Sequence, residues 1–185
     1  NFKDNLKIIN NQIKQIGNLV NEFSDFARMP KPTLRENNLV ILLKESIKLL
    51  KELDKSIEIN FFSNSDKIIL NSDKEQISRV FLNLIKNSIE SIQLKAENIR
   101  KFSKKITIEL TDNYGHINLV IIDSGVGFGK FPEKISDILN PYFTTKKNGT
   151  GLGLSIVNKI INDHNGKIEF IPRNDGAVIK VNFLK

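Results

Sequence analysis

The spacing of apolar residues divides the chain into one long N-terminal helix and a series of shorter elements. Between residues 2 and 27 the apolar positions recur in alternating steps of four and three, which is the heptad pattern of a helix that packs against another helix. These positions are Phe2, Leu6, Ile9, Ile13, Ile16, Val20, Phe23 and Ala27. Pro30 and Pro32 then end the helix, because proline has no amide donor and disfavours helix in the residue before it. We therefore expect a coiled-coil-type helix followed by a proline-containing linker.

Beyond the linker, helical and strand periodicities alternate. Helices are predicted for residues 39–53, capped by Asn37 or Asn38, for a segment capped by Asp73, and for residues 152–163. In the second of these helices, the residues predicted to face the core are Ile77, Phe81, Leu84, Ile85, Ile89 and Ile92. Strands are predicted for residues 57–62, 67–70, 106–111, 117–122, 167–171 and 178–183, with the last four forming two hairpins. The charged residues 95–105 fit a helix tail or an exposed loop, and residues 128–150 fit a long loop with a short helix at 135–139. The pattern predicts an α+β sandwich over residues 33–185, in which three helices cover one face of a mixed sheet, preceded by the helix and linker of residues 1–32.

Composition narrows the chemistry. The net charge of +7 comes from lysines interspersed with acidic residues, which is typical of a solvated basic surface rather than a nucleic-acid interface. The absence of cysteine excludes disulfides and thiolate metal sites, and two isolated histidines cannot build a zinc centre. A bound metal should therefore be a hard cation such as Mg²⁺. No apolar run approaches the roughly 20 residues of a membrane helix, so we expect no membrane contact from this fragment.

Three polar or glycine-rich motifs follow one another along the chain. Asp123 ends an aliphatic strand and is followed by Gly125 and Gly127, which let the backbone turn sharply and approach a ligand. A second glycine cluster, residues 149–153, opens directly into a predicted helix, and Asn83 and Asn87 lie four residues apart in an earlier one. A lone turn of this kind is more often structural, but the three together predict a ligand site.

Four segments in this order resemble the N, G1, F and G2 boxes of sensor histidine kinases, which belong to the GHKL ATPase superfamily. They are residues 83–87, 123–127, 141–146 (Pro-Tyr-Phe-Thr-Thr-Lys) and 149–154 (Gly-Thr-Gly-Leu-Gly-Leu). Residues 23–32 further resemble the sensor kinases of the nitrogen-regulation type. The resemblance covers nearly the whole chain and implies the Bergerat ATP-binding fold.

The resemblance also implies a site for ATP and Mg²⁺. Asp123 would accept the adenine amino group, Asn87 would hold the metal, and Asn83 would contact phosphate or water. Phe143 and Lys146 would belong to a lid over the triphosphate, while the second glycine cluster would present amides at a helix N-terminus. The implied ATP-binding residues are Asn83, Asn87, Asp123, Gly125, Gly127, Phe143, Thr144, Thr145, Lys146, Gly149, Thr150, Gly151, Leu152, Gly153 and Leu154.

Two positions depart from the family pattern. Ser88 stands where many relatives have alanine, and Glu90 stands where some carry a basic residue that reaches phosphate. The phosphate-side cation is therefore open among Lys86, Lys146 and Lys147.

The resemblance finally implies partners. Residues 2–27 would be the second helix of a homodimerisation hairpin whose first helix carries the phosphate-accepting histidine, and that helix is not in this sequence. We interpret His116 and His164 as structural, so this fragment alone should lack autophosphorylation. A response regulator would be the other partner, and the fragment would be the cytoplasmic part of a membrane-anchored sensor. The alternatives are a non-catalytic GHKL dimerisation or signalling module and another GHKL ATPase that hydrolyses ATP.

Overall fold

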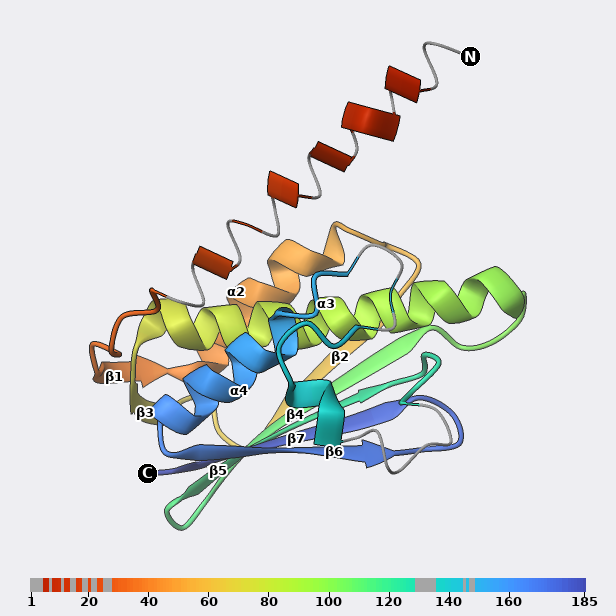
Figure 1. Cartoon of the computed structure of the whole chain (residues 1–185). Helices are drawn as coiled ribbons and strands as arrows, with labels where there is room; N and C mark the ends of the chain where they lie inside the picture. Colours follow the sequence, from red (N-terminus) through yellow and green to blue (C-terminus); the bar gives the residue numbers. More distant parts are fainter. Residues whose placement is uncertain are drawn as a thin grey trace.

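The main body of the chain is a five-stranded sheet covered on one face by three helices (Figure 1). The computed structural model describes residues 28–128, 136–144, 146 and 149–185, together with scattered positions between residues 5 and 24. The strands, in their order across the sheet, are β2 (Glu58–Ser63), β4 (Lys105–Asn113), β5 (His116–Asp123), β7 (Ala177–Leu184) and β6 (Gly166–Pro172). Only β2 and β4 run parallel, so the sheet is mixed. The helices are α2 (Leu39–Lys51), α3 (Lys74–Asn98) and α4 (Gly153–Asp163). This confirms the predicted α+β sandwich.

The core lies between the inward face of the sheet and the apolar face of α3. Alternate residues of β4 and β5 are fully buried, as expected for strands with one face against a core. The apolar residues predicted to face the core from α3 are all buried: Ile77, Phe81, Leu84, Ile85, Ile89 and Ile92. α3 packs against both other helices and against β4 and β5, so it is the central element of the helical layer.

The set of strands differs from the sequence prediction at one place, and the other strand boundaries agree to within one or two residues. The predicted strand at residues 67–70 is β3 (Ile69–Ser72), and it pairs with a strand that was not predicted, β1 (Arg35–Asn38). These two strands form a separate antiparallel sheet, while β2 joins the main sheet beside β4. β1 was missed because its sequence, Arg-Glu-Asn-Asn, has no apolar alternation, and it is held by main-chain pairing and by a hydrogen bond from the Asn37 side chain to the Ser72 carbonyl. Two less definite predictions are now decided. Residues 95–98 belong to the end of α3, which continues to Asn98, and the short helix predicted at 135–139 is the 3₁₀-helix η2 (Ser136–Leu139).

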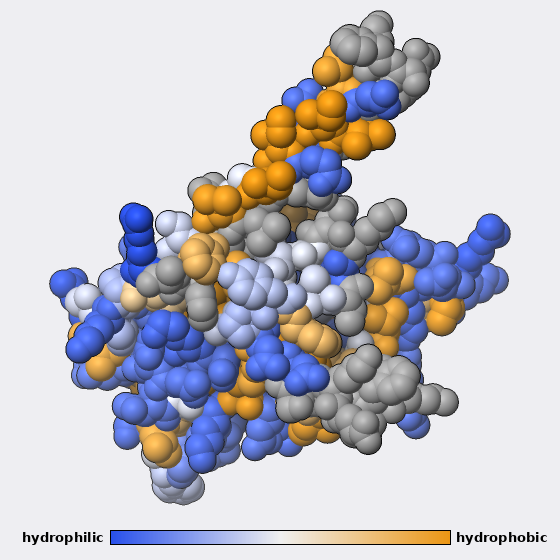
Figure 2. Space-filling model, viewed as in Figure 1, coloured by the Kyte–Doolittle hydropathy of each residue, from blue (hydrophilic) through white to orange (hydrophobic). Residues whose placement is uncertain are grey.

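The described positions between residues 5 and 24 are helical and extend away from the sandwich (Figure 1). Their apolar side chains are exposed, from 43% for Leu6 to 62% for Ile13, and they form the apolar segment at the top of Figure 2. Phe2 and Ala27, the ends of the heptad pattern, lie outside the described residues, and packing against a partner helix stays a prediction. No helix among the described residues is long and apolar enough to cross a membrane.

The linker is bonded to the first turn of α3. Met29 packs against the core, and the Gln76 side-chain amide donates to the Pro30 carbonyl over 3.0 Å. Asp73 caps α3 by accepting from the amides of Glu75 and Gln76, and it also accepts from the Thr33 amide at 2.9 Å. The last linker residues are thus attached to the sandwich.

His164 joins the end of α4 to the start of α3. Its buried ring accepts a hydrogen bond from the Asp73 amide at Nε2 (3.0 Å), so Nδ1 carries the proton and donates to the Ile160 carbonyl at 2.7 Å. Both ring nitrogens are therefore used in holding the fold.

Asp73 generates a prediction on stability. Burial alone would raise the pKa of Asp73, but hydrogen bonds from the amides of Gln76, Thr33 and Glu75 outweigh it and hold this pKa below its usual value. Asp73→Ala should lower the free energy of unfolding by about 1–2 kcal/mol at pH 7, the usual effect of losing an N-cap. Because the folded-state pKa is lowered, this stabilisation is present above about pH 4 and is lost as the pH falls through the folded-state value.

Urea denaturation of the wild type and of Asp73→Ala at pH 7 and at pH 3 measures this contribution. Asp66→Ala is the control, since Asp66 is exposed and only its backbone carbonyl accepts a hydrogen bond. An equal difference between wild type and Asp73→Ala at both pH values would contradict the assignment.

Candidate functional site

One flank of α3 brings the sequence motifs together. Asn83, Asn87, Ser91 and Lys95 follow one another at intervals of four residues and therefore lie on the same side of the helix. Each of them contacts a segment that is distant in sequence. These contacts place the two glycine clusters and the end of the predicted lid, residues 140–150 (the lid segment), along a single line.

The N-terminal end of this flank meets the second glycine cluster. The Asn83 amide nitrogen donates to the Arg79 carbonyl at 2.9 Å, which leaves its oxygen facing Gly153. A Cβ at Gly153 would lie 3.3 Å from that oxygen. α4 begins here without a capping side chain, whereas Asn38 caps α2 and Asp73 caps α3. The first-turn amides of α4 are thus suited to bind an anion in place of a cap.

The middle of the flank holds the turn after Asp123. The Val126 amide donates to the Ser91 hydroxyl (3.1 Å) and lies 3.3 Å from the Ser91 carbonyl oxygen. Gly125 is pressed against the same residue: a Cβ there would overlap the Ser91 hydroxyl and come within 2.7 Å of the Ser91 carbonyl carbon. Glycine is required at this position because helix and turn are in backbone contact.

Asp123 is the buried carboxylate of the site. It is 4% exposed and accepts from the Gly125 amide at 2.9 Å. Burial raises the pKa of Asp123, although the Gly125 amide, the Ser88 hydroxyl, the Ala177 amide and the Lys95 ammonium oppose this. The Ser88 hydroxyl is near enough to favour the ionised form, yet among the described residues it makes no hydrogen bond of good geometry. Two polar groups with unused hydrogen-bonding capacity therefore lie side by side in a buried place.

Lys95 fixes the far side of the same turn. Only 11% of its side chain is exposed, and its ammonium group donates to the Ser124 carbonyl at 2.9 Å and forms an ion pair with Asp175. The Phe102 ring lies beneath the ammonium group, with 4.9 Å between the ammonium nitrogen and the ring centroid. Asp175 belongs to the turn between β6 and β7, and the next residue, Gly176, has φ +103° and packs on the Asp123 carbonyl, where a Cβ would overlap the oxygen. Lys95 thus joins α3, the Asp123 turn and the β6–β7 turn.

The lid segment meets α3 through Lys146. The Lys146 ammonium donates to the Asn87 side-chain oxygen at 2.8 Å and forms an ion pair with Glu90. The segment is further tied to the second glycine cluster, since the Tyr142 amide donates to the Gly151 carbonyl at 3.0 Å. Of the three lysines predicted as candidates for the phosphate-side cation, Lys146 contacts Asn87 and Glu90, whereas Lys86 is largely exposed and lies 3.8 Å from Glu90. Thr145 and Lys147 lie outside the described residues.

The remaining lid candidates are arranged around the same segment. Phe143 is half-buried, and its amide donates to the Asn140 carbonyl at 3.2 Å. The Thr144 hydroxyl accepts from the Lys146 amide at 3.1 Å, and the Thr150 hydroxyl lies 3.4 Å from the Leu152 amide. These local bonds shape the two ends of the lid.

A hard cation fits the oxygen of Asn87. No group of three or more histidine, aspartate or glutamate side chains that could hold a metal occurs in the part of the chain that the structure describes. The Asn87 oxygen, however, already binds a cation, the Lys146 ammonium, with the Glu90 carboxylate beside it. An amide oxygen is a hard oxygen donor of the kind that Mg²⁺ binds.

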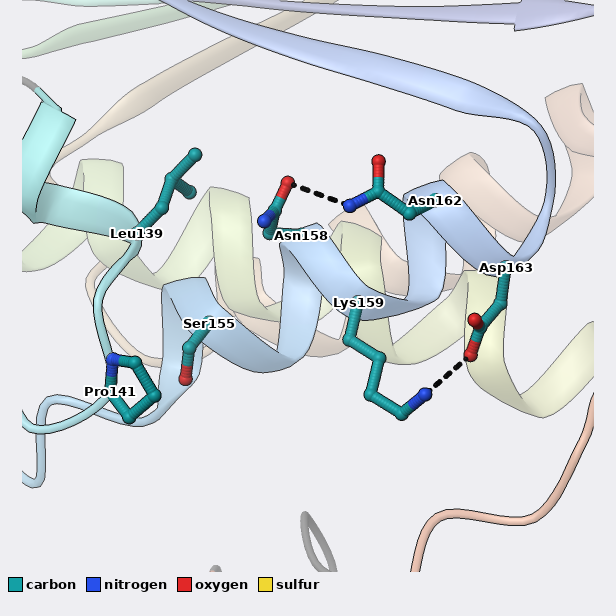
Figure 3. A pocket seen from close by; sticks show the side chains of 7 residues that line it. All are labelled: Leu139, Pro141, Ser155, Asn158, Lys159, Asn162 and Asp163. Atoms are coloured by element: carbon teal, nitrogen blue, oxygen red, sulfur yellow. Dashed lines mark hydrogen bonds and ion pairs between the residues drawn. The ribbon is translucent and has the colours of Figure 1, made fainter.

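A shallow pocket between η2 and α4 lies apart from these groups. It is lined by Leu139, Pro141, Ser155, Asn158, Lys159, Asn162 and Asp163 (Figure 3). Four of its polar side chains are paired with one another, Asn162 with Asn158 and Lys159 with Asp163, and the Ser155 hydroxyl donates to the Leu152 carbonyl. None of the predicted site residues lines it, and we do not assign it to the site.

Sequence reasoning missed Ser91, Lys95 and Gly176. The signal for Ser91 and Lys95 was the continuation of the four-residue interval from Asn83 and Asn87, which is visible in the sequence. Gly176 appeared only as part of a hairpin turn, because its contact with Asp123 depends on the strand order β5-β7-β6.

Comparison with known proteins identifies the family. The family described as histidine kinase-, DNA gyrase B- and HSP90-like ATPases matches residues 72–185. An NtrY-like sensor histidine kinase of Rickettsia felis is 36% identical over 183 residues, covering 98% of this chain and 29% of that protein. The nitrogen regulation protein NtrY of Azorhizobium caulinodans is 34% identical over 92% of this chain and 22% of its own length. The chain thus spans less than a third of these relatives.

Solved structures agree. The catalytic domain of the histidine kinase ThkA is 32% identical, with a TM-score of 0.71 over 82% of this chain and 95% of that one. A complex of ThkA with the response regulator protein TrrA matches all of this chain and 52% of the ThkA chain, with 28% identity and a TM-score of 0.76. The chain therefore belongs to the histidine kinase-, DNA gyrase B- and HSP90-like ATPases, and it corresponds to the ATP-binding catalytic part of a sensor histidine kinase.

Proposed function

We propose that this chain binds Mg·ATP along the flank of α3 and presents the γ-phosphate to a histidine outside this chain, for relay to a response-regulator aspartate. The observation that carries the proposal is the line of contacts from Asn83 to Lys95, which joins both glycine clusters and the lid to one helix. The relatives named above, all sensor kinases or nitrogen-regulation proteins, support the same conclusion.

Asp123 and Ser88 would bind the base. A buried carboxylate accepts the adenine amino group specifically, because a base that lacks this donor leaves the acceptor unpaired at a cost of about 1–3 kcal/mol. The Ser88 hydroxyl beside it, which has no hydrogen-bond partner of good geometry in the part of the chain that the structure describes, offers a further hydrogen bond to the base or to a bridging water. Gly125 and Gly127 let the base lie against the backbone.

Asn87, Asn83 and the start of α4 would hold the phosphate end. ATP supplies the transferable phosphoryl group, and Mg²⁺ neutralises its developing charge. Asn87 would ligate the metal through its side-chain oxygen, and Asn83 would contact phosphate or water from the preceding turn. The uncapped first turn of α4 would donate its amides to phosphate oxygens. With the reactants so positioned, phosphoryl transfer requires little further chemistry from the protein.

Neither histidine of this chain is suited to accept the phosphate. The two ring nitrogens of His164 are both hydrogen-bonded in the core, and His116 starts β5, paired with Leu184 at one end of the sheet. The acceptor would instead lie on a helix that pairs with residues 2–27 in a homodimer. The exposed apolar side chains of this segment support such packing.

The first test measures the site directly. Asp123→Asn and Asn87→Ala should each weaken Mg·ADP binding about ten-fold or more, since a lost buried hydrogen bond to a charged group is worth about 1.5–3 kcal/mol. Isothermal titration calorimetry gives the affinities. Asn71→Ala, which removes an exposed asparagine of β3, is the control and should bind as the wild type does. Wild-type affinity in both site variants would refute the assignment.

Lys95 gives a second test, of positioning rather than contact. Lys95→Met should weaken Mg·ADP binding several-fold and speed hydrogen exchange of the Val126 amide, because the Asp123 turn loses one of its two attachments to α3 and the Ser91 contact alone must hold it. Lys95→Arg should restore most of both, whereas Lys48→Met, on α2, should change neither. Normal exchange at Val126 in Lys95→Met would show that the ammonium group does not hold the turn.

A third test separates phosphotransfer from hydrolysis. After incubation with [γ-³²P]ATP, this chain should carry no acid-labile, base-stable label and should release little free phosphate. Label on His116 or His164 would overturn their interpretation as structural residues. Rapid release of free phosphate would instead favour the hydrolytic GHKL alternative.

A further inference from the structure

The Lys146 ammonium lies between two acceptors on one face of α3. Asn87 and Glu90 are three residues apart, so their side chains emerge together, and Lys146 contacts both. The Lys146 and Glu90 side chains are 37% and 35% exposed, which leaves the pair half-buried. Among the described residues of the lid segment, Lys146 alone forms an ion pair with α3.

The ammonium group occupies the space that a metal on Asn87 needs. The distance from the Lys146 nitrogen to the Asn87 oxygen is 2.8 Å, and Mg²⁺ binds oxygen at about 2.0–2.1 Å. A metal ion on the same lone pair would lie within about an ångström of the ammonium nitrogen. The two cations therefore exclude one another on this lone pair, and a metal that binds there must displace Lys146.

Glu90 determines how firmly Lys146 is held. Its carboxylate forms the charged half of the contact, while Asn87 contributes only a neutral oxygen. Lys86, the other cation near Glu90, is 59% exposed and lies at 3.8 Å, so it competes weakly. Removing the charge of Glu90 should free Lys146 without altering Asn87.

We propose that Glu90 and Lys146 form a latch on the metal position of Asn87, which a magnesium-bound nucleoside di- or triphosphate opens by replacing the ammonium group. The proposal rests on the proposed function and adds a role for Glu90. The closed latch lowers the fraction of molecules that are competent to bind, and the apparent affinity falls in proportion. Once displaced, Lys146 is free to pair with phosphate oxygens.

The test is a double-mutant cycle read by calorimetry with ADP. Glu90→Gln should bind Mg·ADP about two- to five-fold more tightly than the wild type, the range expected from losing a half-exposed ion pair. With ADP in excess EDTA the same variant should bind as the wild type does, because no metal needs the Asn87 oxygen. In the Lys146→Met background, Glu90→Gln should have no effect on Mg·ADP affinity.

Asp163→Asn is the matched control. It breaks the Lys159–Asp163 pair on α4, whose side chains are 39% and 31% exposed, and it should leave the affinity unchanged. Circular dichroism before each titration confirms that every variant is folded.

Any other result would contradict the proposal that Glu90 and Lys146 form a latch. Weaker Mg·ADP binding by Glu90→Gln would make Glu90 a ligand of the metal or nucleotide, and unchanged binding would make the pair inconsequential. A gain that persists in EDTA or in the Lys146→Met background would show that Glu90 acts by repelling phosphate. Failure of the proposed function looks different, since the wild type itself would then bind no Mg·ADP.

Discussion

The arrangement of the site depends on one geometric constraint, the four-residue interval along α3. Successive residues at this interval are rotated by about 40° and displaced by about 6 Å, so they form a slowly winding line. At one end of the line Asn83 meets the start of α4, and at the other Lys95 meets the β6–β7 turn. Because α3 is anchored in the core by a continuous apolar face, the polar flank is held rigidly in register with the sheet. Separate parts of an extended ligand can then be contacted by successive residues of one rigid helix, α3.

The site buries three polar groups in surroundings that do not by themselves favour folding. Asp123 is buried with its pKa raised by desolvation, Ser88 is buried without a hydrogen-bond partner among the described residues, and Lys95 is nearly enclosed. Burial of such groups opposes folding unless each is paired. Lys95 finds its partners within the chain, whereas Asp123 and Ser88 retain unused capacity. The contrast separates a group that shapes the turn from groups whose hydrogen-bonding capacity is left for a ligand, as proposed above.

Much of the fold followed from residue pattern because the main sheet and its helices are strongly amphipathic. The asparagine cap of α2, the aspartate cap of α3 and its buried face were all predicted correctly, and each depends on local chemistry. β1 could not be predicted, since its pairing with β3 is specified by main-chain bonds between segments more than thirty residues apart. Lys146 was one of three lysines open as the cation at the site. Its contact with Asn87 and Glu90 depends on how the lid folds back over α3, which no periodicity encodes.

The attachment of the linker gives α3 a second role. Asp73 binds the linker amide of Thr33 with the same carboxylate that caps the helix, and Gln76 binds Pro30 one turn later. A helix of 25 residues is a rod about 37 Å long. The linker contacts and the site residues Asn83 and Asn87 therefore lie on one continuous element, so the position of the linker and the position of the site are fixed by the same helix.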